Sequence, residues 1–185
     1  MDSIFQSSVL LRRKNDQNAM NNSLSKSLLI TLFASLLTSC EKPSVIDDAE
    51  LLNRLLTNSV DTLVYNSSKH VIEAELYRNF FPGSSIPTKR PLVAYVSLVN
   101  LDTINISTDL DITKIYIIRD PLIWVSSPVS TSSQNIPEYK LSKFSNDGPE
   151  WDTNILVDVV LEIWNSVKSE NYLMIVRDIT IERIE

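Results

Sequence analysis

The chain has 185 residues and a formal net charge of -6, with 43% hydrophobic and 22% charged residues. These proportions are those of a globular protein with an ordinary core, and they exclude a wholly disordered chain. The two glycines, Gly83 and Gly148, are too few for a glycine-rich phosphate loop or a dinucleotide-binding motif. The acidity lies after Cys40 without any cluster of lysine and arginine, so the composition also argues against nucleic-acid binding.

The first predicted element is the uncharged segment LLITLFASLL (residues 28–37), which follows Lys26. As a helix it would span about 15 Å, which is half of the about 30 Å hydrocarbon core of a bilayer. Its length is therefore typical of the apolar region of a signal peptide and not of a transmembrane helix. Met20 is better placed than Met1 as the start of such a signal, which would leave residues 1–19 untranslated.

The segment ends in Leu37-Thr38-Ser39-Cys40, which contains the only cysteine of the chain. This ending resembles the lipobox of bacterial lipoproteins, in which leucine and small residues precede an obligatory cysteine. The resemblance implies that residues 1–39 are a signal peptide, that a peptidase cuts between Ser39 and Cys40, and that Cys40 carries a diacylglyceryl group and often a further acyl chain. Two or three acyl chains hold a protein firmly in a membrane, whereas one chain does so only marginally.

The resemblance also implies a location in the bacterial cell envelope. Glu41, and not Asp, follows the cysteine, which implies the outer membrane if the bacterium is Gram-negative. Two alternatives remain for Cys40: a core cysteine of a cytosolic protein, or an unmodified cysteine beside an ordinary signal-cleavage site.

Residues 40–44 are predicted to be a short lipidated tether, and residues 45–185 a single β-rich domain. A helix is expected over about residues 46–57, with Ser44 as its cap and acidic residues in its first turn. The pattern that predicts it is a helical stripe of Leu51, Leu52, Leu55 and Leu56.

Alternation and β-forming residues predict strands along the rest of the chain. The predicted strands cover residues 60–66, 70–81 (with a helix as the alternative), 92–101, 104–108, 112–118, 122–127, 155–164, 171–178 and 179–185. Loops are expected at 81–91 and 126–139, and a break at Asp120-Pro121. In the strand 155–164 the predicted buried face consists of Val157, Val159, Leu161 and Ile163.

Many short strands with one early helix predict a mainly β fold, an Ig-like antiparallel β-sandwich with one short N-terminal helix. A single cysteine excludes the disulfide of true immunoglobulin domains. The C-terminal stretches DGPEWDTNILVDVVLEI and YLMIVRDITIER resemble the strand pair of uncharacterised β-sandwich lipoproteins.

The inventory of reactive side chains predicts no catalytic residue, no metal site and no cofactor. His70 is the only histidine, whereas histidine-rich metal sites and nucleophilic triads need more or need a partnered base. It is expected to be a polar residue at a strand edge. The acidic residues could in principle hold Ca²⁺ or cleave a glycan, but they are expected to be solvated loop residues; they are Asp109, Asp111, Asp147, Glu150 and Asp152.

Aromatic residues are the candidate binding elements. Trp124 and Trp164 are expected in the core and Trp151 near the surface, while the remaining candidates are Tyr95, Tyr116, Tyr139 and Tyr172. The preferred function is a membrane-anchored, non-enzymatic envelope lipoprotein that binds a protein or a glycan. The alternative is a lipid-anchored enzyme or enzyme inhibitor that uses the loop carboxylates. An exposed aromatic patch on a sheet would favour the first, and a pocket that gathers Asp109, Asp111 or Asp152 the second.

Overall fold

The computed structural model describes residues 44–82, 89–131 and 135–185. The predicted signal peptide, its cleavage site at Ser39 and the predicted lipidation site Cys40 lie outside the described residues. In the described part of the chain, no helix has the length and apolar character that a bilayer crossing needs.

The described residues form one helix and ten strands, so the predicted mainly β architecture with a single short helix is confirmed. The elements along the chain are β1 (Ser44–Asp47), α2 (Ala49–Asn58), β2 (Leu63–Tyr65), β3 (Ser68–Asn79), β4 (Leu92–Asn100), β5 (Leu110–Arg119), β6 (Leu122–Ser126), β7 (Val129–Ser130), β8 (Lys140–Ser145), β9 (Leu156–Asn165) and β10 (Glu170–Ile184).

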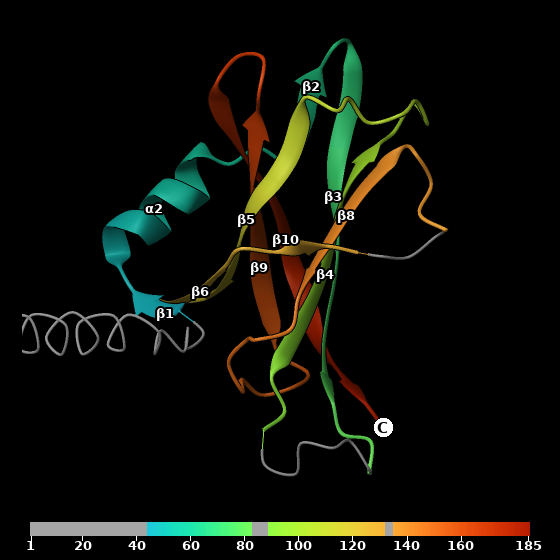
Figure 1. The fold of residues 1–185 in the computed structure, drawn as a ribbon. Helices are drawn as coiled ribbons and strands as arrows, with labels where there is room; N and C mark the ends of the chain where they lie inside the picture. The colour runs from blue at the N-terminus through green and yellow to red at the C-terminus, as the bar shows by residue number, and fades with distance from the viewer. Residues whose placement is uncertain (1–43, 83–88, 132–134) are drawn as a thin grey trace, which may run out of the picture. The chain divides into compact units, whose positions relative to one another are not determined.

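The strands form one curled sheet in the order β1-β6-β5-β9-β10-β3-β4-β8-β7, with β2 paired to β3 outside this path (Figure 1). The long strand β10 belongs to two layers. Its residues from Glu170 to Thr180 pair antiparallel with β9, and Ile181–Ile184 pair with β3. We call the layer from β1 to β9 sheet A and the layer from β3 to β7 sheet B. The pair of β10 with β3 is parallel, which departs from the purely antiparallel arrangement expected.

A hydrophobic core lies between sheets A and B. It contains the four residues predicted for the buried face of β9, of which Val159, Leu161 and Ile163 are fully buried. Trp124 on β6 is also fully buried there, as predicted. The alternation of strand side chains therefore identified this core correctly, because successive residues of a strand face opposite sides of the sheet.

A second cluster lies between the outer face of sheet A and helix α2. Leu55 is fully buried in it and contacts a sheet surface that includes Tyr116, Val160 and Ile175. This cluster explains why Val160 is buried although it faces away from the main core. It also shows that one outer face of the sandwich is covered by the helix, as Figure 1 illustrates.

The predicted start and cap of the helix were wrong. Residues 44–47 form β1, which pairs with β6, and Ser44 lies opposite Val125. The N-cap is Asp48, whose Oδ1 accepts hydrogen bonds from the backbone N–H groups of Glu50 and Leu51, both at 3.0 Å. The β-branched Val45 and Ile46 favour a strand, and Asp48 is an equally good cap that begins the helix later.

Other boundaries also differ from the prediction. The strand expected at 60–66 is confined to β2, and residues 104–108 form no strand. The loop expected at 126–139 contains the two-residue β7, and the sequence analysis missed β8. Asp120 and Pro121 form the turn between β5 and β6, with Arg119 paired to Leu122.

Candidate functional site

Sheet B presents an outer face that no helix covers within the described residues. In β3, β4 and β8, the residues at alternate positions point into the core, and the others point outward. Strand pairing then fixes which outward side chains become neighbours. Tyr95 lies directly between Glu75 and Phe144, and Ser97 between Glu73 and Ser142.

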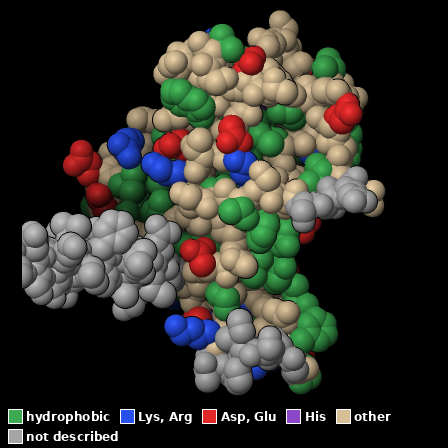
Figure 2. All heavy atoms as spheres, in the orientation of Figure 1, with side chains coloured by type: hydrophobic (Ala, Val, Ile, Leu, Met, Phe, Trp, Pro, Cys, Tyr) green, Lys and Arg blue, Asp and Glu red, His purple; other side chains and the backbone are tan. Residues whose placement is uncertain are grey.

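A groove of about 600 Å³ lies on this outer face. Its floor comes from β3, β4 and β8, and its rim from Thr131 and residues 135–137. The side chains on the floor are Glu73, Glu75, Tyr95, Ser97, Lys140, Ser142 and Phe144. This volume falls within the roughly 300–1,000 Å³ that is typical of ligand sites. In the view of Figure 2, hydrophobic side chains gather in a band over β4 and the neighbouring strands.

Three aromatic rings form a row that begins on the groove floor with Phe144 and Tyr95 and continues to Tyr77 beside it. The ring of Tyr95 lies 6.1 Å from that of Tyr77 at an interplanar angle of 15°, and 5.6 Å from that of Phe144 at 18°. These centroid distances exceed the contact distance of about 3.5–4.0 Å between carbon atoms. The nearly parallel rings are therefore stacked, but they do not lie directly face to face at contact distance. Tyr95 remains 39% exposed. The row is an aromatic surface that a ligand can contact.

Polar groups border the aromatic row. The Nζ atom of Lys140 donates to Glu73 Oε2 at 2.5 Å, and the hydroxyls of Ser97 and Ser142 are 2.7 Å apart. The hydrogen bond from Lys140 to Glu73 raises the pKa of the Lys140 ammonium, which stays charged. Burial, followed by the effects of Tyr95 and the negative charge of Glu75, raises the pKa of Tyr77. The Tyr77 hydroxyl is therefore a neutral donor at ordinary pH.

A second groove of about 520 Å³ continues along the same face. It lies between β3 and the end of β10 and shares Ala74 and Glu75 with the first groove. Tyr77 also lines it. Together the two grooves offer a longer surface than either offers alone.

Asp109 and Asp111, the predicted carboxylate pair, have different partners and do not act together. Asp109 Oδ2 accepts hydrogen bonds from Tyr65 at 3.3 Å and from Ser107 at 2.9 Å. Asp111 pairs with Lys143 at 2.6 Å. The two residues hold different parts of the fold together, and neither lines the grooves described above.

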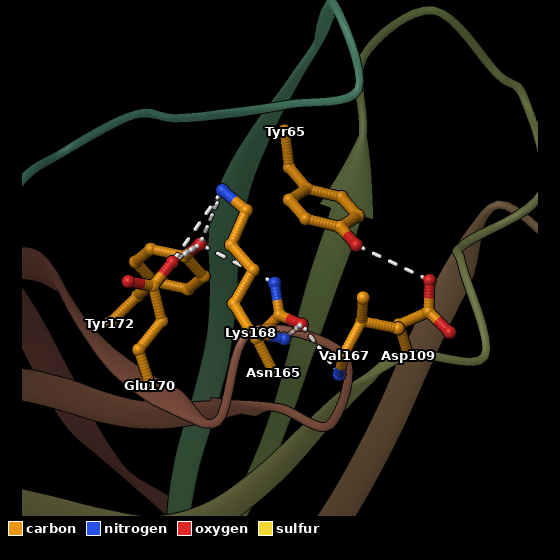
Figure 3. Close-up of polar contacts among 7 residues, drawn as sticks. All are labelled: Tyr65, Asp109, Asn165, Val167, Lys168, Glu170 and Tyr172. Carbon is orange, nitrogen blue, oxygen red and sulfur yellow. Dashed lines mark hydrogen bonds and ion pairs between the residues drawn. The ribbon is translucent and has the colours of Figure 1, made fainter.

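Figure 3 shows that Tyr172, a predicted binding residue, belongs to a polar cluster around the turn between β9 and β10. The Lys168 ammonium lies 5.7 Å from the centre of the Tyr65 ring and 5.9 Å from that of Tyr172. It also pairs with Glu170 at 3.5 Å, and Tyr172 donates a hydrogen bond to Glu170. Asn165 Oδ1 accepts the N–H groups of the turn at residues 167 and 168. The cluster fixes the turn, so these side chains already have partners.

The acidic residues around Trp151 also have separate partners. Glu150 accepts the N–H of Arg90 at 3.0 Å and lies 3.8 Å from Arg78, while Asp152 lies 3.9 Å from Arg119. Asp147 accepts a hydrogen bond of 3.4 Å from Ser126. Among the described residues, no group of three or more His, Cys, Asp and Glu is placed to hold a metal ion.

The expectation that Trp151 lies near the surface was wrong, because its side chain is only 6% exposed and packs in the main core. The buried Arg78 donates to the Trp151 carbonyl at 2.7 Å and thereby holds this segment against β3. Trp164, expected in the core, is only half-buried on β9. The acidic residues beside Trp151 suggested that its side chain is exposed to solvent. Instead, Glu150 and Asp152 pair with arginines while the Trp151 ring is buried.

The expectation for His70 was also wrong. His70 is 2% exposed, and it lies between β2 and β4 because β3 pairs with Leu63 on one side and Asn100 on the other. Its Nδ1 has no hydrogen-bond partner among the described residues. The pairing of the short β2 removes the sheet edge that the sequence suggested.

Of the four candidate tyrosines, Tyr95 alone lines the groove. Tyr116 is buried beneath α2, and Tyr139 is half-buried just before β8. Sequence reasoning missed Glu73, Glu75, Ser142 and Phe144 of the first groove and Tyr77 of the second. The segment KLSKFS has apolar residues only at positions 141 and 144, which is not the alternation of a strand, so the sequence held little signal for β8 and none for the strand beside it.

Comparisons with protein-family models, curated proteins and solved structures found no match to this chain. The interpretation of the groove therefore depends on its own geometry and chemistry.

Proposed function

We propose that this protein is a lipid-anchored protein of the bacterial cell envelope whose β domain is a non-enzymatic binding module for a protein or a glycan. Cleavage between Ser39 and Cys40 would leave the acylated Cys40 at the N-terminus. β1 begins at Ser44, only four residues later in the sequence, so the extended tether would reach no farther than about 14 Å. The domain would then work close to the membrane surface.

The observation that supports the binding role is the aromatic row with its groove, on the face of sheet B that no helix covers in the described part of the chain. A protein rarely leaves a large aromatic surface exposed without a use for it. Here Tyr95, Tyr77 and Phe144 come from three strands that also supply carboxylate, ammonium and hydroxyl groups. An exposed aromatic surface with polar and charged groups beside it can recognise a ligand that is itself part apolar and part polar.

The alternative function, an enzyme or inhibitor that uses the loop carboxylates, has no specific support. Asp109, Asp111 and Asp152 each have a different cationic or hydroxyl partner, as described above. They do not line the groove.

The anchor is tested by growing cells with an alkyne-bearing fatty acid and comparing the wild-type chain with Cys40→Ala. We expect the probe to label the wild-type protein and not the variant, and the variant to keep its signal segment. Equal labelling of both proteins, or a wild-type chain that keeps residues 20–39 inside the cell, would contradict the anchor.

The binding role is tested separately with a photo-crosslinking amino acid in place of Tyr95 in living cells. The matched control carries the same group in place of Phe81, which is 49% exposed outside the grooves. We expect a distinct crosslinked product at position 95 that is absent at position 81. Identical patterns at both positions would count against the groove as a binding site.

A further inference from the structure

We infer that the groove of sheet B binds a saccharide chain made of neutral or amine-bearing sugars, with Tyr95 as the central stacking residue. This inference depends on the proposed binding function and narrows it to one class of ligand.

The aromatic row fits the apolar face of a sugar ring. Pyranose rings present C–H groups that carry a small positive charge, and the face of an aromatic ring is negative because of its quadrupole. Tyr95 is 39% exposed although its ring stacks between those of Tyr77 and Phe144, at centroid distances of 6.1 and 5.6 Å. The exposed part of the Tyr95 ring therefore remains available for contact.

The polar groups beside the rings fit a ligand that carries many hydroxyl groups. Such a ligand needs acceptors and donors close together, and the groove supplies carboxylate oxygens at Glu75, hydroxyls at Ser97 and Ser142, and an ammonium at Lys140. A proline-rich peptide could also use the aromatic row. Proline has no N–H to donate, however, and would form no hydrogen bond with the Glu75 carboxylate.

The charge of the groove selects against acidic sugars. The Glu73 carboxylate is paired with Lys140 at 2.5 Å, which leaves the charge of Glu75 in excess beside the aromatic row. The chain as a whole carries -6. Like charges that face each other oppose binding, so polyuronates should be excluded, whereas neutral and amine-bearing sugars are not.

The two adjoining grooves favour a chain of sugars over a single one. They share Glu75, and Tyr77 lies on the side of Tyr95 that faces the second groove. A ligand that lies across both would contact the sheet from β8 to the end of β10.

The inference is tested by calorimetric titration of the full chain in detergent micelles. The probes are oligosaccharides of glucose, of N-acetylglucosamine and of glucosamine, with polygalacturonate as the acidic probe. We expect at least one of the first three to bind and polygalacturonate to bind more weakly. Tyr95→Leu keeps an apolar side chain but removes the flat ring, so affinity should fall at least about tenfold. Tyr95→Phe should retain affinity to within about threefold, because it keeps the ring.

Phe81→Ala is the matched control, and it should bind as the wild type does. Unfolding midpoints of all variants establish that Tyr95→Leu remains folded. Failure of all three neutral or amine-bearing probes, a preference for polygalacturonate, or unchanged binding by Tyr95→Leu would overturn the inference. If the saccharides fail but position 95 still crosslinks specifically to a protein, the binding module stands and only its ligand class is wrong. If both fail, the groove is not a binding site.

Discussion

Tyr116 shows how a single residue acquires unusual chemistry from its place beneath the helix. It is 4% exposed, and its hydroxyl donates to Glu162 Oε2 at 3.0 Å. Burial, followed by the hydrogen bond and charge of Glu162, raises the pKa of Tyr116 to about 12, although Arg54 opposes this shift. The folded protein therefore keeps this phenol protonated at a pH where an ordinary tyrosine, with a pKa of 10.0, ionises.

This shift predicts a loss of stability at high pH. Below pH 10 the folded and unfolded states both keep the proton, and between pH 10 and about 12 only the unfolded state releases it. The free energy of unfolding should therefore fall across this window. The Tyr116→Phe variant loses the Glu162 hydrogen bond at neutral pH but should show a flatter decline, which urea unfolding at several pH values would measure. Parallel declines in both proteins would contradict the assigned pKa.

At the scale of elements, α2 stabilises the fold by covering sheet A. Leu55 is fully buried against the sheet, while the neighbouring leucines Leu51, Leu52 and Leu56 are partly buried around it. A ten-residue helix is only marginally stable by itself. Its packing and the Asp48 cap therefore hold it in place.

Leu55→Ala should lower the free energy of unfolding by about 2–5 kcal/mol, because it leaves a cavity between the helix and the sheet. Thr57→Ala, on the exposed face of the same helix, is the matched control and should change stability by less than about 0.5 kcal/mol. Urea unfolding would measure both. Similar effects of the two substitutions would show that the helix does not pack on the sheet as described.

Sequence patterns predicted some of the elements and missed others. Alternation predicted β9 and its buried face, because the face toward the main core is apolar throughout whereas the other face carries Asp158 and Glu162. The late start of α2 was missed because Ser44 and Asp48 are both good caps and only the pairing of β1 with β6 decides between them. The groove was missed because Glu75, Tyr95 and Phe144 meet only through the order β3-β4-β8, and strand order depends on long-range contacts.

At the scale of the whole molecule, sheets A and B are linked on two sides. On one side β10 belongs to both. On the other, the buried Lys143 of β8 donates to the Ile112 carbonyl of β5 at 2.8 Å and pairs with Asp111 at 2.6 Å. The register of β5 with β9 shifts between Ile112 and Lys114, and this irregularity lies beside the carbonyl that Lys143 uses.

Lys143→Met should remove this second link. A hydrogen bond from a charged group to a buried acceptor contributes about 1.5–3 kcal/mol, so the free energy of unfolding should fall by about 2 kcal/mol. Lys114→Met is the control, because Lys114 is a half-exposed lysine on β5 whose pair with Glu162 spans 3.7 Å. Exposed pairs contribute little. Amide exchange at β5 and β8 should accelerate in Lys143→Met alone, and unchanged exchange would refute the link.

Because β10 pairs with both β9 and β3, it connects sheet A to sheet B. Asp178, with φ of 57°, lies at the irregularity between Val176 and Ile179, just before the strand passes from β9 to β3. Separating the two layers at this edge requires breaking the pairing of Ile181–Ile184 with β3. A protease that removes the last residues of the chain would remove this pairing. We therefore expect such cleavage to destabilise sheet B, which carries the aromatic row, before it destabilises sheet A, which the helix covers.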